Sequence, residues 1–359
     1  MNLIANVCEI VLIYRKAALP MKHVTIKDIA KVANVSYATV SRALSGSPEI
    51  GEDTRERILK LCKEMGYTTN YVARSMVMRQ THLLGLVVAH IDNPFMSEIA
   101  YYVEQYAREH GYNIMLCNSS HETTLEQQVV ELLVGRQVDG IIIIPASSDS
   151  YQTLRPFTTK VPTVFVSENL KDAADSYVSV DNARGTYLGT EYLYKLGHRR
   201  ILYFGARPAS TTHQLRAEGY LAACRDYGME PMFWNSGFSS SSIQNGGILA
   251  RELFQKPVDF TAIFSSTDAN ALGIMQAADE FGIRIPEDVS LMGFDNIRYA
   301  ELPKINLTTI EQPKKTMASL AVAMLLERIA DDSVGYSHKI LVPTLVERKS
   351  CLPLTHTEQ

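Results

Sequence analysis

The stretch VSYATVSRALSGSPEI, residues 35–50, carries side chains better suited to hydrogen bonding with a partner than to packing in a core. Its one basic residue is Arg42, and Ser36, Thr39 and Ser41 supply hydroxyl groups. A guanidinium can donate two hydrogen bonds to O6 and N7 of a guanine, and hydroxyl groups bond to either bases or phosphates. These residue types favour a surface that contacts DNA.

Two capping patterns would position this stretch. Thr25 precedes an apolar pattern and Asp28 stands three residues later, which predicts a capping box at the start of a helix. Asn34 tolerates the left-handed conformation that ends a helix. Ser36 can cap a second helix, so we expect a helix, a short turn and a helix, which is the helix-turn-helix arrangement.

The second helix is expected to bury Val40 and Leu44, which lie one turn apart. In helix-turn-helix proteins the N-terminal half of this helix enters the major groove, but an ordinary solvent-exposed face explains the spacing equally well. The outward residues of that half are Tyr37, Ala38, Ser41 and Arg42. A third helix is expected after Gly51, with Ile58, Leu59, Cys62 and Met65 inward and Gly66 at its end.

Charge is unevenly distributed along the 359 residues, although the net charge is only −4. Residues 21–80 contain ten Lys and Arg against six Asp and Glu, whereas residues 81–359 carry a net charge of −9. A small basic segment attached to a large acidic one is typical of a nucleic-acid reader joined to a domain with another task.

The first twenty residues, MNLIANVCEIVLIYRKAALP, contain an apolar run that includes Glu9 and has its positive charges after it. The run is too short to span a membrane, and the charge order is the reverse of a signal peptide's. We expect residues 1–20 to be a dispensable extension from an upstream start, with an anchor or partner-binding segment as the alternative. The protein is expected in the cytoplasm.

Cysteine and histidine spacing shows no metal-binding pattern. The five cysteines are far apart and form no CxxC pair, and the nine histidines are scattered. This argues against a zinc ribbon or a disulfide framework and for a reducing compartment. The sequence also has no Gly-rich phosphate loop and no evident nucleophile beside a base, so we expect no metal, no cofactor and no enzymatic activity.

From residue 82 the pattern changes to apolar, β-branched runs that alternate with amphipathic segments, which predicts parallel sheets of the doubly wound type. Eight strands are expected, at 83–91, 113–120, 138–146, 162–168, 177–180, 200–206, 260–267 and 289–296. Eight strands are more than we expect in a single sheet here, so we expect two similar α/β subdomains. A ligand would bind between them, beyond the carboxyl ends of the strands.

The residues at those strand ends are carboxylates, hydroxyls and aromatic rings, which suit a ligand with many hydroxyl groups. They lie at Asp92–Phe95, Ser147, Ser167–Glu168, Thr267–Asp268 and Asp295.

The strings VSYATVSRALSG, NYVARSM, LGLVVAHIDNPFMSEI, QVDGIIIIP and VSLMGFDN resemble the lactose-repressor (LacI/GalR) family, and the resemblance extends over residues 22–353. It implies an all-α helix-turn-helix head and an α/β core like the periplasmic sugar-binding proteins, built of two doubly wound parallel-sheet subdomains. By the same resemblance Tyr37, Ala38 and Arg42 read bases. The residues that would mostly contact phosphates are Thr25, Ser36, Thr39, Ser41 and Asn70.

Residues 69–81 form a separate short segment. Asn70 can cap a helix of about two turns, which is too short to be stable alone in water, so we expect it to be ordered only on DNA. In the family, a leucine from each such hinge helix wedges the central base step in the minor groove. That position is Met76 here, and methionine is among the apolar residues that can act as a wedge.

The resemblance also implies an effector site between the subdomains. On its motifs Arg216 grips the effector, Asp295 accepts hydrogen bonds from it and Phe238 stacks against it. The full expected set is Phe95, Ser147, Ser167, Arg216, Phe238, Thr267, Asp268 and Asp295. A capping or turn carboxylate is the alternative role for Asp268, and also for Asp181.

These observations predict a sequence-specific transcriptional regulator that represses carbohydrate-use genes. We expect a homodimer on a near-palindromic operator, controlled by a small-molecule effector, a sugar. Sugar-binding members often have Asp where this chain has Ser167 and Asn where it has Thr267, so a purine or nucleoside corepressor and a phosphoprotein partner stay open. A sugar-binding protein that does not bind DNA is a further alternative.

The expected division of the chain is an extension at 1–20, a DNA-binding head at 21–68, a hinge at 69–81, a core at 82–350 and a tail at 351–359. Within the core, residues 82–180 would join 310–338, and residues 181–309 would join 339–350. The tail has no leucine heptad, so a tetramer is not expected.

Overall fold

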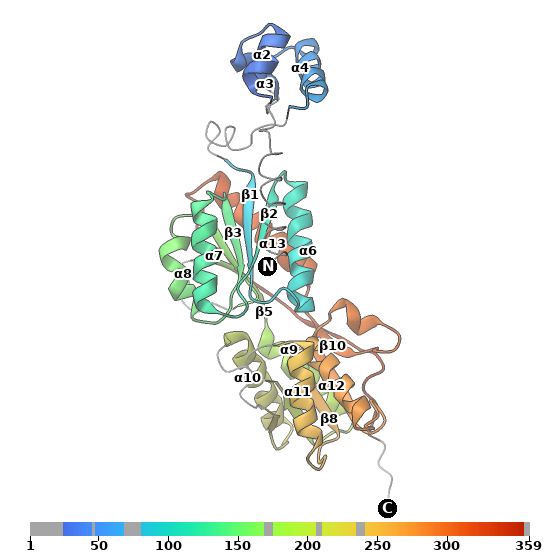
Figure 1. The fold of residues 1–359 in the computed structure, drawn as a ribbon. Helices are drawn as coiled ribbons and strands as arrows, with labels where there is room; N and C mark the ends of the chain where they lie inside the picture. The colour runs from blue at the N-terminus through green and yellow to red at the C-terminus, as the bar shows by residue number, and fades with distance from the viewer. Residues whose placement is uncertain are drawn as a thin grey trace, which may run out of the picture. The chain divides into compact units, whose positions relative to one another are not determined.

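The computed structural model describes residues 24–44, 47–67, 80–168, 175–205, 210–234 and 241–354. The chain divides into two compact units, Met1–Gln80 and Thr81–Gln359. This division falls inside the predicted hinge segment, so the head and the core are separate bodies (Figure 1).

The first unit contains three described helices, α2 (Ile26–Ala33), α3 (Tyr37–Leu44) and α4 (Glu52–Glu64). They enclose a small core of Ile29, Ala30, Ala33, Val40, Ala43, Ile58 and Cys62. The prediction that Leu59 faces inward is wrong, because 47% of this residue is exposed. Met65 packs against the core as predicted, and Leu61 does so in place of Leu59, because the buried stripe of α4 lies on the other side of Ile58 and Cys62.

Local hydrogen bonds confirm the predicted helix boundaries. The Thr25 hydroxyl accepts from the Asp28 amide at 3.4 Å, and the Asp28 carboxylate accepts from the Thr25 amide at 2.8 Å. Asn34 ends α2 at φ 52° and ψ 45°, in the left-handed region. Ser36 Oγ then accepts from the Thr39 amide at 3.0 Å, which caps α3. The turn is therefore determined by side chains within four residues of each helix end.

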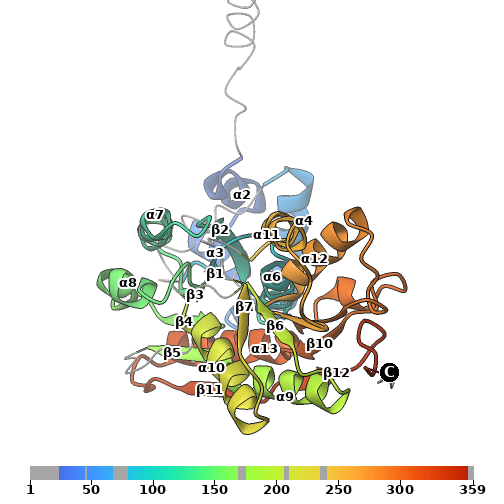
Figure 2. The same ribbon diagram turned by 90° about the horizontal axis from the view of Figure 1, so that it is seen from below.

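The second unit has two six-stranded sheets. The first has the order β11-β5-β4-β3-β1-β2 and is parallel throughout. Its strands are β1 (Leu83–Val88), β2 (Asn113–Asn118), β3 (Gly140–Ile144), β4 (Thr163–Val166), β5 (Ser176–Val180) and β11 (His338–Leu341). One face carries α7 (Thr123–Gly135) and α8 (Ser150–Thr158), and the other carries α6 (Pro94–Glu109) and α13 (Lys314–Ala330), as Figure 2 shows.

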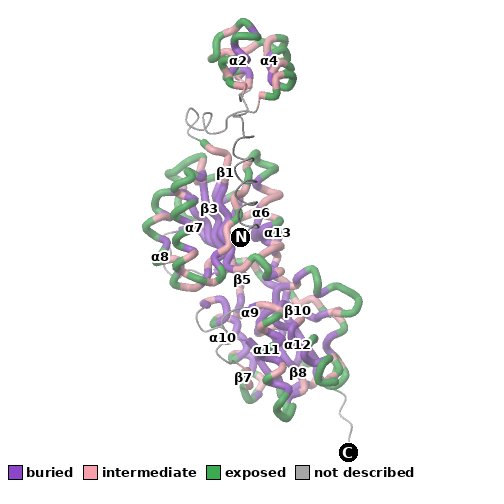
Figure 3. The backbone as a smooth tube through the Cα atoms, viewed as in Figure 1, coloured by how far each residue is buried: buried purple, intermediate pink, exposed green. Residues whose placement is uncertain are grey.

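The second sheet has the order β12-β10-β9-β8-β6-β7, in which only β12 is antiparallel to its neighbour. Its strands are β6 (Ile201–Phe204), β7 (Met232–Trp234), β8 (Ala262–Ser265), β9 (Ser290–Asp295), β10 (Thr308–Glu311) and β12 (Thr344–Val346). The helices are α9 (Asn182–Lys195), α10 (Thr211–Asp226), α11 (Ile243–Phe254) and α12 (Asp268–Glu280), with a 3₁₀ turn at Arg298–Glu301. Most strands are buried between the two helical layers (Figure 3).

All eight predicted strands are present, and the prediction of two parallel-sheet subdomains is confirmed. Four strands of three or four residues were not predicted: β7, β10, β11 and β12. β7 and β11 contain no fully buried residue, so they lack the continuous apolar run that marks a central strand.

The chain crosses between the subdomains three times, and two predicted boundaries shift. β10 continues the second sheet to Glu311, and β11 keeps the chain in the first sheet to Leu341. The predicted tail also begins too early. Cys351 is 6% exposed, and the Leu354 amide donates to the Leu196 carbonyl at 2.7 Å. Residues 351–354 therefore belong to the second subdomain, and the remainder of the predicted tail lies outside the described residues.

Candidate DNA-reading face and effector cleft

The outward face of α3 in the head presents the predicted base-reading residues. Tyr37 is 65% exposed, Ser41 and Arg42 are exposed, and Ala38 is half-buried. Val40 and Ala43 on the opposite side are buried and hold the helix on the core. The helix therefore offers a rigid backbone with solvated side chains, as groove recognition requires.

Arg42 has an acidic partner in the head. Its Nε lies 3.3 Å from a carboxylate oxygen of Glu49, and both side chains are more than half exposed. A guanine edge or a phosphate would have to replace this acid. Replacing Glu49 in this way costs little free energy, because exposed ion pairs contribute little to stability.

The hydroxyls predicted to contact phosphates also have roles as caps. The Thr25 hydroxyl donates to Asp28 Oδ2 at 2.7 Å, and the hydroxyls of Ser36 and Thr39 are 2.9 Å apart. These groups lie at the N-terminal ends of α2 and α3, where free amides and the helix dipole favour an anion. The predicted contacts of Asn70 and Met76 lie outside the described residues.

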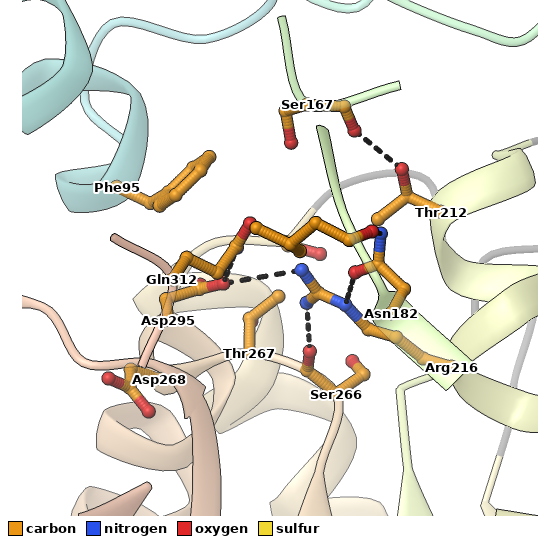
Figure 4. A network of polar contacts seen from close by, with 12 residues as sticks. Phe95, Ser167, Asn182, Thr212, Arg216, Ser266, Thr267, Asp268, Asp295 and Gln312 are labelled. Carbon is orange, nitrogen blue, oxygen red and sulfur yellow. Dashed lines mark hydrogen bonds and ion pairs between the residues drawn. The ribbon is translucent and has the colours of Figure 1, made fainter. Parts of the chain in front are cut away.

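The second unit contains a cavity between its two subdomains, at the carboxyl ends of the strands. Six of the predicted effector residues are in its lining: Phe95, Ser147, Ser167, Arg216, Thr267 and Asp295. Phe238 lies outside the described residues. The strands thus bring together side chains from positions 95 to 295 of the chain, as expected of a doubly wound fold (Figure 4).

Arg216 on α10 is the central cation of the cavity and is 3% exposed. Its Nε donates to Asn182 Oδ1 at 2.9 Å and one terminal nitrogen donates to the Ser266 carbonyl at 2.5 Å. The other terminal nitrogen lies 3.4 Å from Asp295 Oδ1, and the guanidinium stacks 3.8 Å from the centre of the Phe294 ring. Contacts on this many sides fix the plane of the guanidinium before any ligand binds.

Asp295 is held in an unusual backbone conformation. Its φ is 125° and that of Asn296 is 49°, both in the region that disfavours side chains other than glycine. The Lys314 ammonium donates to both carbonyls, at 2.8 and 2.6 Å, and Gln312 Nε2 donates to Asp295 Oδ1 at 2.7 Å. Lys314 begins α13 in the other subdomain, so the backbone that carries the Asp295 carboxylate is held partly from the first subdomain.

Burial raises the pKa of the Asp295 carboxyl, and Arg216 opposes that shift. The side chain is 2% exposed, so an ionised Asp295 depends on its contacts with Arg216, Gln312 and a ligand. This is the chemistry of a site that recognises hydroxyl or amine donors.

The prediction that Asp268 lines the cavity is wrong. Its carboxylate accepts from the Thr309 hydroxyl at 2.6 Å and from the Ile297 amide at 2.9 Å, and it lies apart from the bonded network in Figure 4. Burial and the Asp295 carboxylate raise its pKa. Asp268 therefore connects α12 to β10 beneath the site. This is a structural role, similar to the capping or turn carboxylate that was the alternative prediction. Asp181 accepts from the Arg184 amide at 3.0 Å and caps α9.

Two contacts join the subdomains across the cavity. The Thr212 hydroxyl donates to the Ser167 carbonyl at 2.6 Å and lies 3.1 Å from a carboxylate oxygen of Glu168. On the other side, Asn93 Nδ2 donates to the Ser241 carbonyl at 2.8 Å. Ser167 has φ 69°, which turns its carbonyl towards α10. A bound ligand would be enclosed by both subdomains.

Several lining residues are absent from the expected effector set: Asn93, Met96, His121, Glu168, Ser210, Thr212, His213 and Ser241. Asn93 and Glu168 were among the residues noted at predicted strand ends. His121, Thr212 and His213 lie beyond the predicted strand ends, in loops or on α10, and no local pattern marks them.

Two family models match the chain. Residues 25–70 match the model of bacterial regulatory proteins of the lacI family, and residues 190–351 match a periplasmic binding protein-like domain. Over 335 residues the chain is 33% identical to the ribose operon repressor of Haemophilus influenzae, covering 92% of this chain and 99% of that protein. It is 32% identical to the transcriptional repressor PurR of Pasteurella multocida, covering 91% and 98% of the two chains.

Solved structures agree with these matches. The lac repressor dimer bound to operator and the anti-inducer ONPF superposes with a TM-score of 0.82 at 26% identity, covering 92% of this chain and all of that one. A LacI-family regulator from Enterococcus faecium with bound ribose superposes with a TM-score of 0.68 at 27% identity, covering 76% and 100%.

A helix-turn-helix head joined to a two-subdomain ligand-binding core defines a DNA-binding transcriptional regulator controlled by a small-molecule effector. The chain belongs to the LacI family of bacterial regulatory proteins. The relatives named above are transcriptional repressors, and none is named as an enzyme. Among the described helices, none combines the length and apolar character needed to cross a membrane.

Proposed function

We propose that this protein represses genes of carbohydrate use as a homodimer, and that its effector is a small uncharged sugar, a pentose such as ribose. The observation that carries the proposal is the presence of two buried carboxyl groups, Asp295 and Glu168, in the lining of one cavity. Both carboxyls are at most 5% exposed, and burial raises the pKa of each. The protein would act in the cytoplasm by binding alone, without catalysis.

The charge of the cavity supports an uncharged ligand. A phosphate or carboxylate would place an anion in a cavity that already contains two buried carboxyl groups, and Arg216 already contacts Asp295 and two further acceptors. Sugar hydroxyls instead donate to the carboxylates and accept from nearby serine and threonine hydroxyls. Phe95, 5% exposed in the lining, offers a face for the apolar side of a sugar ring.

A purine base or nucleoside is the second candidate. The rings of His121 and His213 line the same cavity as Phe95, and a planar base could stack on any of them. The relatives also include PurR and the repressor CytR of Escherichia coli, which is 29% identical over 91% of this chain. In this case the ligand would donate to Asp295 through a ring N–H or an exocyclic amine.

Apolar side chains exposed on the core support the homodimer. Tyr101 on α6 is 49% exposed, Leu116 on β2 is 46% exposed and Ile248 on α11 is 46% exposed. Exposed apolar groups of this size often lie in protein interfaces. Two copies would place two α3 helices in successive major grooves of a near-palindromic operator.

A thermal-shift screen tests the effector. D-ribose, D-xylose, ribose 5-phosphate, hypoxanthine and adenosine are each added to the full-length protein. A ligand at a hundred times its Kd stabilises by about 2.7 kcal/mol, which is a clear shift. We expect D-ribose to stabilise and ribose 5-phosphate not to. Stabilisation by the phosphate alone would contradict the proposal, and a response only to hypoxanthine or adenosine would establish the second candidate.

Selection from a library of random duplexes tests the DNA-binding part. We expect enrichment of one near-palindromic sequence and a reduced affinity when the effector is added. Light scattering on the same sample should give the mass of two chains. Enrichment of no sequence would contradict operator binding.

A further inference from the structure

The core begins at a dense group of hydrogen bonds around Asp139, which stands just before β3. Asp139 Oδ1 accepts from the amide and from the hydroxyl of Thr81, each at 2.8 Å. Asp139 Oδ2 accepts from the His82 amide at 2.9 Å, and the Thr81 hydroxyl lies 3.1 Å from the Gln137 carbonyl. One carboxylate thus holds the first two residues of the second unit.

The backbone on both sides of this contact turns sharply. His82 has φ 52° and Gln137 has φ 57°, both in the left-handed region. The His82 carbonyl accepts from the Asn113 amide at 2.9 Å, and its ring lies 5.2 Å from that of Tyr112. These contacts give the chain a defined direction at Thr81, the point from which it leads towards the head.

The strands that carry this group also reach the effector cavity. Asp139 precedes β3 and Thr81 precedes β1, and the two strands pair from Leu84 and Gly140 onwards. Beyond their carboxyl ends, the first turn of α6, which follows β1, supplies Phe95 to the cavity, and the loop after β3 supplies Ser147. The paired strands β1 and β3 therefore have the start of the core at one end and the effector cavity at the other.

We propose that Asp139 is a positioning residue for operator recognition: it fixes the direction in which the chain leaves the core and so determines the half-site spacing that the dimer selects. The proposal rests on the proposed function as a dimeric operator-binding protein. A carboxylate suits this role because it accepts three hydrogen bonds at once, which are stronger than those of a neutral acceptor.

Three variants separate the contacts. In Asp139→Asn, the amide can still accept from Thr81 through its oxygen, but its NH₂ group faces the His82 amide, donor against donor. Thr81→Val removes the hydroxyl contacts and keeps the Thr81 amide bond. Thr81→Ser keeps the hydroxyl and should behave as the wild type. Glu131→Gln, an exposed acid on α7, is the charge-matched control.

The experiment uses the full-length proteins and the duplex selected by the wild type, with half-site spacing unchanged, shortened or lengthened by one base pair. Affinities are measured by fluorescence anisotropy. We expect the preference for the selected spacing to fall about tenfold in Asp139→Asn and less in Thr81→Val, as expected for lost hydrogen bonds to a charged group. Thr81→Ser and Glu131→Gln should keep the wild-type preference.

A purely structural role for Asp139 would lower the melting temperature and leave the spacing preference unchanged, and that result would overturn the proposal. If Asp139→Asn does not fold, the melting temperature and the spacing preference of Thr81→Val are compared with those of the wild type instead. If the wild-type protein selects no operator, the proposed function is overturned. If the wild type selects an operator but the variants show the same spacing preference as the wild type, only the role of Asp139 is overturned.

Discussion

The two recognition regions of this protein differ in how their key arginines are held. Arg42 lies on an exposed helix face beside one exposed acid, whereas Arg216 is 3% exposed and contacts an amide oxygen, a carbonyl, a carboxylate and an aromatic ring. The first side chain is exposed and can exchange its acid for a partner that provides its own geometry. The second is fixed, because the ligand must be recognised by a cavity that exists before it binds.

The difference also concerns the range of the contacts. The ion pair of Arg42 joins residues seven positions apart, while Arg216 contacts Asn182, Ser266 and Asp295, which are 34, 50 and 79 positions away. We therefore expect substitutions in the cavity to affect both stability and ligand binding, and substitutions of the exposed α3 side chains to affect DNA recognition alone. Four predictions test this contrast, from the largest expected effect to the smallest.

Arg216→Met should have the largest effect. It leaves the buried Asp295 carboxylate without its cation, and breaking a buried pair in this way costs about 3–5 kcal/mol. The free energy of unfolding in urea and the thermal shift with D-ribose should both fall. Arg225→Met, an exposed arginine on the same helix, is the control. Equal effects of the two substitutions would contradict the central role of Arg216.

Lys314→Met should destabilise the core by about 1–3 kcal/mol, because the buried Asp295 carbonyl and the partly buried Asn296 carbonyl lose their donor. The effector affinity should fall as well, since Lys314 holds Asp295 in a strained conformation. Lys315→Met removes the same charge from the exposed neighbouring position. Calorimetry with the effector identified in the screen measures both quantities, and unchanged affinity in Lys314→Met would show that Asp295 keeps its position unaided.

Arg42→Ala should reduce the preference for operator over random DNA by about 1–3 kcal/mol and leave the stability of the protein unchanged. The reason is that its contacts in the free protein are exposed. Lys60→Ala on α4 removes one charge from the same unit and should weaken binding to both DNAs alike, if at all. An equal loss on operator and random DNA in Arg42→Ala would refute its base-reading role.

Ser36→Ala should have the smallest effect, a loss of about 1 kcal/mol in the stability of the head, because the Thr39 amide loses its cap. Ser41→Ala, at an exposed position of the same helix, should leave that stability unchanged. Amide hydrogen exchange on α3 measures the difference. Equal exchange rates in the two variants would mean that the cap adds nothing measurable.

Helix starts and stops in the head were predictable because their causes are local. The Thr25–Asp28 box, the left-handed Asn34 and the Ser36 cap each involve residues no more than four positions apart. The choice between Leu59 and Leu61 was not predictable in this way. Both residues adjoin the Ile58–Cys62 stripe, and only the position of α4 against α2 and α3 decides which of them packs.

The eight predicted strands and the location of the cavity also followed from the sequence. A buried parallel strand requires a continuous apolar run, and the residue after it faces the cleft by the geometry of the fold. Phe95, Ser147, Ser167, Thr267 and Asp295 were found by that rule. Asp268 follows the same rule in the sequence, yet its side chain turns to Thr309, because α12 begins there and presents the carboxylate to β10.

What the sequence determined by itself is therefore the class of elements, their ends and the chemical character of the two recognition surfaces. The tertiary structure alone decided which side chains share a contact over long separations, such as Lys314 with Asp295, Thr212 with Ser167 and Asp139 with Thr81. The physical reason is that capping and periodicity act within a few residues. A hydrogen bond between residues 19, 45 or 58 positions apart depends on how the sheets and helices pack, which no local pattern encodes.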